Sequence, residues 1–331
     1  MKKVLLASTA LLGFAGAAAA EVSLSGYAEM GIFGGSDVET QFHNDIVINF
    51  NMSGSTDNGL EFGAKVQLDD TNGSHTPNGL PKFDDEAVWV SGSFGKITLG
   101  ETDGAYDWAL QEIYSGTSLF DDHSTHAGAY WFTGLDGAYD NQIMRYEYSF
   151  GDFAVAISAE QDDGRTSTLG SCGYDGVTFL CLKQTMTSGR ATGDTILSIG
   201  GKWSGSLSGA DVQVGVGYTT ANDVDEWGVS AAASLANGFS VNAGYADFSA
   251  TGVSADWWGL GAAYTTGALL VGVNYGEYGG DAMGSGFGLV VNYDLGGGAV
   301  AMLGYGSSSD GGSSFNGNGE DTFSAGLGLS F

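Results

Sequence analysis

Apolar residues occupy every second position in many segments of this chain. In the last ten residues, "TFSAGLGLSF", the apolar positions are Phe323, Ala325, Leu327, Leu329 and Phe331. The residues between them are small or polar, so one face of the segment is apolar and the other carries almost no side chain. Strict alternation of this kind is typical of a β-strand with one buried face.

The same alternation recurs along the chain in segments of roughly 9 to 11 residues, which is the length of a tilted strand that crosses a bilayer. These segments lie near residues 46–52, 60–68, 144–150, 153–157, 197–203, 212–218, 227–233, 239–245, 258–264, 269–275 and 287–293. Tyrosines near strand ends suit the aromatic girdles at a membrane interface; they are Tyr218, Tyr245, Tyr264, Tyr275, Tyr293 and Tyr305.

Short and long connections alternate between these segments. The tight turns are 56–59, 94–96, 151–152, 204–210, 236–238, 265–267 and 295–298. The longer, more acidic connections are 34–43, 69–84, 102–141, 162–194 and 307–320, with shorter ones near 221, 250 and 280. This arrangement predicts an all-β transmembrane antiparallel barrel of about 16 strands, with both termini on one side.

A closed barrel explains why each strand has two different faces. In lipid no water satisfies the backbone amides and carbonyls, so the sheet closes on itself and the apolar face meets the acyl chains. The inner face borders water, and we expect small or polar residues to suffice there because nothing has to pack against it. A soluble β-sandwich would show the same alternation, but it rarely alternates short and long connections this regularly.

The first 20 residues have the pattern of a secretory signal peptide. Lys2 and Lys3 precede an apolar stretch, and residues 18–20 form a small-residue cleavage site. The alternative, an N-terminal membrane anchor, needs about 20 apolar residues, which this run lacks. We therefore expect a signal peptide at 1–20 and one barrel domain at 21–331. The net charge of −29 excludes nucleic acid as a partner.

Cys172 and Cys181 are the only cysteines. In an oxidising compartment a local disulfide is the expected use of such a pair, and two free thiols are the alternative. A disulfide here would restrain one loop, since both residues lie in the connection 162–194.

The connection 102–141 is much longer than the usual ~6 residues, and such length generally serves function. It is rich in aromatic residues and has no lysine or arginine; its carboxylates are Asp103, Asp107, Glu112, Asp121, Asp122, Asp136 and Asp140. We expect this segment to fold into the pore and present carboxylates to passing ions. The alternative is a solvated external loop.

Alternation also predicts which strand residues point into the lumen. The inward set is Glu29, Asp45, Val47, Glu61, Lys65, Gln67, Arg145 and Lys202. Only three of these are basic, and the seven carboxylates of 102–141 together with Glu29, Asp45 and Glu61 face them, so a negative potential is expected at the narrowest section.

Catalytic and metal-binding patterns are weak. The four histidines are expected outside the strands, where a rigid Ser–His site would be built, so we expect no enzyme activity and no organic cofactor. "DDHSTH" at 121–126 has residue types that a divalent metal uses, and the acidic loops are candidate ligands for structural Ca²⁺. Solvated carboxylates without metal are the alternative in both cases.

Several stretches together resemble one known family. "EVSLSGYAEMGIF", "NMSGSTDNGLEFGAKVQ", "VSGSFGKITLG", "YDLGGGA" and the terminal "GLSF" are similar to the general porins of Rhodobacter and Paracoccus type. The resemblance implies a homotrimer of sixteen-stranded barrels, with the third long loop folded into each pore. It also implies that Phe331 belongs to the signal read by the outer-membrane assembly machinery.

The sequence departs from this family in one respect. Those porins set acidic loop residues against a basic cluster on the facing wall, whereas the inward face here is poor in basic residues.

The expected function is passive diffusion of ions and small hydrophilic solutes through the outer membrane of a Gram-negative bacterium, with a preference for cations. Its expected surroundings are lipid and lipopolysaccharide. The alternative is a substrate-selective channel in which aromatic residues of 102–141 grip one class of solute.

Overall fold

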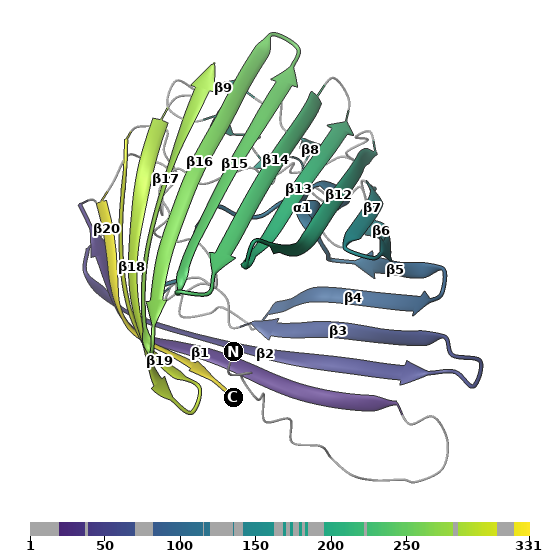
Figure 1. Ribbon diagram of the computed structural model, residues 1–331, viewed down its shortest axis with the longest axis horizontal. Helices are drawn as coiled ribbons and strands as arrows, with labels where there is room; N and C mark the ends of the chain where they lie inside the picture. Colours follow the sequence, from purple (N-terminus) through teal and green to yellow (C-terminus); the bar gives the residue numbers. More distant parts are fainter. Residues whose placement is uncertain are drawn as a thin grey trace.

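The computed structural model describes residues 20–36, 39–69, 82–114, 116–119, 135, 142–161, 168–169, 173–174, 179–180, 183–184, 195–221, 224–280, 284–309 and 321–331. Sixteen antiparallel strands close into a single barrel, as predicted (Figure 1).

The barrel strands follow one another in chain order around the wall. Their bounds are β1 (Glu21–Gly35), β2 (Gln41–Ser55), β3 (Glu61–Asp69), β4 (Lys82–Gly92), β5 (Gly95–Gly100), β6 (Ile143–Phe150), β7 (Phe153–Glu160), β12 (Ile196–Leu207), β13 (Ala210–Ala221), β14 (Val224–Leu235), β15 (Phe239–Ala250), β16 (Val253–Thr266), β17 (Leu269–Gly280), β18 (Gly284–Gly296), β19 (Ala299–Ser308) and β20 (Asp321–Ser330). Four two-residue strands lie between β7 and β12, namely β8 (Thr168–Leu169), β9 (Gly173–Tyr174), β10 (Phe179–Leu180) and β11 (Lys183–Gln184).

The barrel closes where the first strand meets the last. Tyr27 pairs with Ser330, and the ladder continues to Gly35 opposite Thr322. Beyond the last strand, the Phe331 amide donates to the Gly26 carbonyl at 2.9 Å. No edge of the sheet is therefore left open at this seam, as a lipid environment requires.

The predicted two-faced character of the strands is confirmed. The outward residues of β17 (Val271, Val273 and Tyr275) are exposed, whereas the inward residues between them are buried. Aromatic pairs on the outer face join neighbouring strands, with ring centroids 5.4 Å apart for Trp227 and Tyr245 and 4.5 Å apart for Phe239 and Tyr264.

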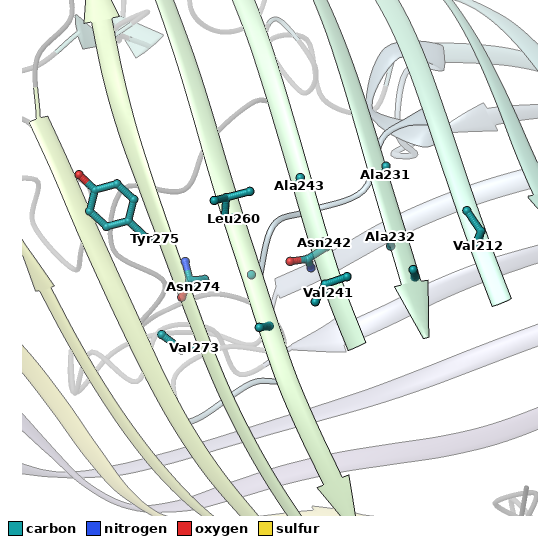
Figure 2. Close-up of a pocket in the computed structure, with 13 residues that line it drawn as sticks. Val212, Ala231, Ala232, Val241, Asn242, Ala243, Leu260, Val273, Asn274 and Tyr275 are labelled. Carbon is teal, nitrogen blue, oxygen red and sulfur yellow. The ribbon is translucent and has the colours of Figure 1, made fainter. Parts of the chain in front are cut away.

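The outer face also carries a shallow apolar depression over β13 to β17, with a volume of about 600 Å³ (Figure 2). Ala231, Ala243 and Ala262 contribute small outward side chains there, and Leu260 and Val273 contribute larger ones. It belongs to the apolar outer surface and not to the lumen.

The first long connection is shorter than predicted. β1 continues to Gly35 and β2 begins at Gln41, so half of the predicted segment 34–43 belongs to strands. The expectation that all histidines lie outside strands was wrong for His43, which stands in β2 and whose ring Nε2 lies 2.9 Å from Glu29 Oε2. Its side chain points inward, where this carboxylate gives it a partner.

Within the part of the chain that is described, no helix has the length and apolar character needed to cross a membrane. The one helix of this part, α1 (Ala105–Ala109), follows β5 and lies within the barrel (Figure 1).

Candidate functional site

The start of the long connection between β5 and β6 runs along the inner wall of the barrel. At its beginning the Ala105 amide donates to the hydroxyl of Ser158 on β7, at 2.7 Å. Further along, the Gln111 amide donates to the hydroxyl of Ser230 on β14, at 2.8 Å. Near its far end the Ser118 hydroxyl forms a hydrogen bond with the hydroxyl of Ser324 on β20. We call residues 103–119 the wall segment; residue 115 is outside the described part.

Two asparagines of the wall hold the middle of the wall segment. Asn242 of β15 donates through Nδ2 to the Tyr114 carbonyl at 2.7 Å, and Asn292 of β18 donates to the Thr117 carbonyl at 2.9 Å. The wall segment is irregular at these residues, so its carbonyls lack partners within a helix or sheet. The two side-chain amides supply the hydrogen bonds that these carbonyls would otherwise lose on leaving water.

Inward glycines form the surface on which the wall segment lies. A Cβ on Gly200 of β12 would come within 2.0 Å of the Ala105 carbonyl oxygen, and one on Gly215 of β13 within 2.0 Å of the Ala109 carbonyl oxygen. The expectation that nothing packs against the inner face was therefore wrong on this side. The inward residues are small here because the backbone of the wall segment lies directly against them.

Buried side chains anchor the wall segment at two further points. Tyr106 is fully buried, and its hydroxyl donates to Glu226 Oε1 of β14 at 3.0 Å. Burial, with the Glu226 carboxylate beside it, raises the pKa of the Tyr106 hydroxyl above its ordinary value. Ile113 is also fully buried, and it packs with Trp257 and Ala246.

The opposite side of the wall segment faces the lumen and is acidic. Ala105, Tyr106 and Ala109 are buried against the wall, whereas Asp103 is exposed and Asp107 is half-buried. Glu112 is also half-buried. The start of the predicted segment 102–141 therefore lies inside the barrel, and the role of its carboxylates toward passing ions stays a prediction.

The basic residues on the neighbouring wall are held by the wall segment and by carboxylates. Arg145 of β6 is buried, donates to the Asp103 carbonyl, and lies 3.3 Å from the Glu147 carboxylate. Lys202 of β12 donates to the Trp108 carbonyl at 2.9 Å. These two predicted residues therefore come together with Asp103, and neither extends freely into the lumen.

Lys65 of β3 also forms an ion pair. Its ammonium forms an ion pair with Asp85 of β4, and both side chains are partly exposed. Glu29 is buried with His43, and the Tyr27 hydroxyl donates to Glu29 Oε1 at 2.9 Å. Glu29 is therefore a buried wall residue.

The remaining predicted strand residues lie at different heights of the barrel. Asp45 and Gln67 are half-buried, and Val47 pairs with Tyr27 on β1. Glu61 is exposed at the start of β3, next to a short turn, and its pair with Ser55 ends the ladder with β2. The structure therefore does not gather the whole predicted set into one ring.

Asp121, Asp122, Cys172 and Cys181 lie outside the described residues, as do "DDHSTH" and the predicted signal peptide up to residue 19. Among the side chains that are described, no three of His, Cys, Asp or Glu come together as metal ligands would.

Sequence reasoning missed Glu147 and Glu226 as parts of this site, and it included Trp108 only among the aromatic residues of 102–141. Inward glycines were visible in the sequence, namely Gly200 of β12 and Gly215 and Gly217 at alternate positions of β13. They are the signal that a second layer of backbone lies against these strands.

The chain is similar to known porins in both sequence and structure. The family model described as "Gram-negative porin" matches residues 7–313. A porin of Rhodobacter capsulatus is 37% identical over 148 residues, which cover 44% of this chain and 46% of that protein.

Solved porin structures share the fold across nearly the whole chain. A refined porin structure superposes with a TM-score of 0.65 at 23% identity, covering 94% of this chain and 100% of that one. A triple mutant of Rhodopseudomonas blastica porin gives a TM-score of 0.61 at 20% identity, with the same coverage of both chains. Because the family model covers most of the sequence, this chain belongs to the Gram-negative porin family.

Proposed function

We propose that the protein is an outer-membrane channel for passive diffusion of ions and small hydrophilic solutes, and that it prefers cations. The observation that carries the proposal is the arrangement of charge on the wall segment. Asp107 and Glu112 are partly exposed inside the barrel, and Asp103 is exposed although it also lies 3.6 Å from Arg145. Arg145 and Lys202 are tied to the segment or to carboxylates. Rings of acidic side chains select for cations.

Two physical effects strengthen this preference. The barrel wall has a low dielectric constant and focuses the field of the carboxylates into the aqueous lumen. The net charge of −29 adds a negative background at the channel entrances. The porins that the sequence resembles set a basic cluster on the wall that faces the acidic loop, which produces an electric field across the pore. Such a field needs free basic residues on the facing wall, and Lys65 on this wall is paired with Asp85.

The reversal potential of the purified protein in planar bilayers tests the proposal. With a KCl gradient we expect a potential that reports K⁺ preference at about 0.1 M salt and a weaker preference at about 1 M, because the Debye length falls from ~10 Å to ~3 Å. Anion preference at the lower salt concentration would overturn the cation selectivity. A protein that forms no pores would overturn the channel function itself.

A substrate-selective channel remains the second candidate, based on the aromatic residues of 102–141. Of these, Tyr106 is buried against the wall and Trp108 contacts Lys202, so neither offers a free ring to a solute. Conductance block that saturates at millimolar concentration of one solute class would favour this candidate over general diffusion.

We further propose export with removal of residues 1–20, assembly into homotrimers, and insertion among lipid and lipopolysaccharide. The family membership and the pattern of the N-terminal residues support these points. Mass spectrometry of the purified protein tests the cleavage, and the oligomer mass in detergent tests the trimer.

A further inference from the structure

One aromatic ring lies next to both of the basic residues on the wall beside α1. The Lys202 ammonium lies 3.7 Å from the centroid of the Trp108 ring, and the Arg145 guanidinium carbon lies 5.9 Å from it. Cation–π attraction at such distances contributes about 0.5–1 kcal/mol at exposed sites and ~2 kcal/mol where water is excluded. The indole therefore holds both cations against the wall.

The backbone of the same residue also binds Lys202. The ammonium donates to the Trp108 carbonyl at 2.9 Å, so one of its three hydrogens is directed toward α1. A flexible lysine at an inward position would otherwise extend into water. Here the ring and the carbonyl of Trp108 keep its charge close to the strands.

Carboxylates neutralise the basic side chains on the wall beside α1. Glu147 lies 3.3 Å from Arg145 and 3.5 Å from Lys96, and the Asp103 carboxylate lies 3.6 Å from Arg145. The buried charge of Arg145 is thereby paired, as its low exposure requires. Lys202 contacts the ring and the carbonyl of Trp108, and the carboxylates of Glu147 and Asp103 also act on its charge.

We infer that Trp108 is a selectivity-determining residue of the channel, because it withdraws the positive charge of Lys202 from the ion path. The carboxylates of Asp107 and Glu112 then act on passing ions without the Lys202 ammonium extending beside them. This inference rests on the proposed cation selectivity, which it explains by the position of one tryptophan.

Reversal potentials of three variants test the inference. Trp108→Leu removes the ring but retains apolar bulk and the backbone carbonyl, so Lys202 loses its cation–π contact and extends into the lumen more readily. We expect the K⁺/Cl⁻ permeability ratio at about 0.1 M salt to fall by about twofold or more. Trp108→Phe keeps an aromatic face and should retain most of the ratio. Adding Lys202→Met to Trp108→Leu should restore the ratio, since the released charge is then absent.

A double-mutant cycle separates this role from a structural one. Lys202→Met should change the ratio less in the wild-type channel than in the Trp108→Leu channel. Equal effects in both backgrounds, or an unchanged ratio in Trp108→Leu, would overturn the inference. A ratio that falls in Trp108→Leu without rescue by Lys202→Met would also overturn it, because displacement of α1 would then be the cause.

Amine labelling of the wild-type protein provides a measurement that needs no variant. With a water-soluble acylating reagent, Lys202 should react at least about threefold more slowly than the partly exposed Lys65, because ring and carbonyl shield its nitrogen. Equal labelling rates would overturn the inference. A wild-type channel that prefers Cl⁻ would contradict the proposed function alone, since the Trp108 inference is judged by the shift between variants and by this labelling.

Discussion

The hydroxyls of Ser118 and Ser324 lie 2.6 Å apart, although 206 positions separate them in the chain. Ser118 lies next to the last residue of the wall segment, and Ser324 belongs to β20, which closes the barrel against β1. Leu119 lies across this seam, where a Cβ on Gly326 would come within 2.6 Å of its Cδ1 atom and one on Gly31 within 2.3 Å. Docking of the wall segment therefore depends on a closed barrel.

Two adjacent glycines on β12 provide a matched test of how closely the wall segment packs. Gly200→Ala should destabilise the protein by about 1–3 kcal/mol, because its Cβ would overlap the backbone at Ala105. Gly201→Ala points outward, where the nearest atom is 3.9 Å away, and should be neutral. Free energies of unfolding in urea and single-channel conductance measure both effects. Equal destabilisation of the two variants would contradict the packing argument.

The barrel itself was predictable from the sequence because each strand has lipid on one side and water or the wall segment on the other. Each outward residue meets lipid and each inward residue meets water or the wall segment, so alternation reports the strands directly. Short turns were located by Gly and Asp residues, such as Gly151 and Asp152 between β6 and β7.

The interior was less predictable because it is set by contacts between distant segments. Glu29 was assigned to the lumen from alternation, which gives the side of a strand but not the depth of burial beside His43. Likewise, Lys202 points inward as predicted, yet the position of its ammonium group is set by contact with the Trp108 ring. No periodicity along one strand contains that information.

Neutralising lumen carboxylates should weaken the cation preference. Asp107→Asn combined with Glu112→Gln removes two charges from the wall segment, so the K⁺/Cl⁻ ratio should fall by about twofold or more at ~0.1 M salt and change little at ~1 M. Asp57→Asn combined with Asp152→Asn removes the same charge from exposed turns and serves as the control. A larger effect of the turn variants on reversal potential would count against the constriction.

Tyr106 should stabilise the barrel mainly through its hydrogen bond with Glu226. Tyr106→Phe removes a donor from a carboxylate that is fully buried and whose Oε2 has no hydrogen-bond partner among the described residues. The expected loss is about 1–3 kcal/mol in the free energy of unfolding. In a Glu226→Leu background the same change should cost little, since no buried acceptor remains. An identical cost in both backgrounds would show that the hydrogen bond is not responsible.

Cys172→Ala should leave barrel assembly and conductance nearly intact. β9 pairs with β10 so that Gly173 stands opposite Leu180, and these residues follow Cys172 and precede Cys181 in the sequence. We therefore propose a disulfide that restrains this connection outside the sixteen barrel strands. Thiol labelling under denaturing conditions, with and without reductant, measures the bond. Free thiols in the native protein, or loss of folding in the variant, would contradict the proposal.

Phe331 should matter for assembly in the cell more than for the stability of the finished barrel. Its ring is 70% exposed on the outer surface, whereas its backbone is paired with Gly26 through bonds of 2.9 and 3.3 Å. Phe331→Ala retains both backbone bonds and removes little buried area, so the free energy of unfolding should change by less than about 1 kcal/mol. If the terminal ring is read by the assembly machinery, the same variant should accumulate less in the outer membrane. Phe153→Ala, which removes an exposed outward ring from β7, controls for the loss of apolar surface. Equal membrane levels of the two variants, measured by quantitative blotting of outer-membrane fractions, would argue against a signal at Phe331.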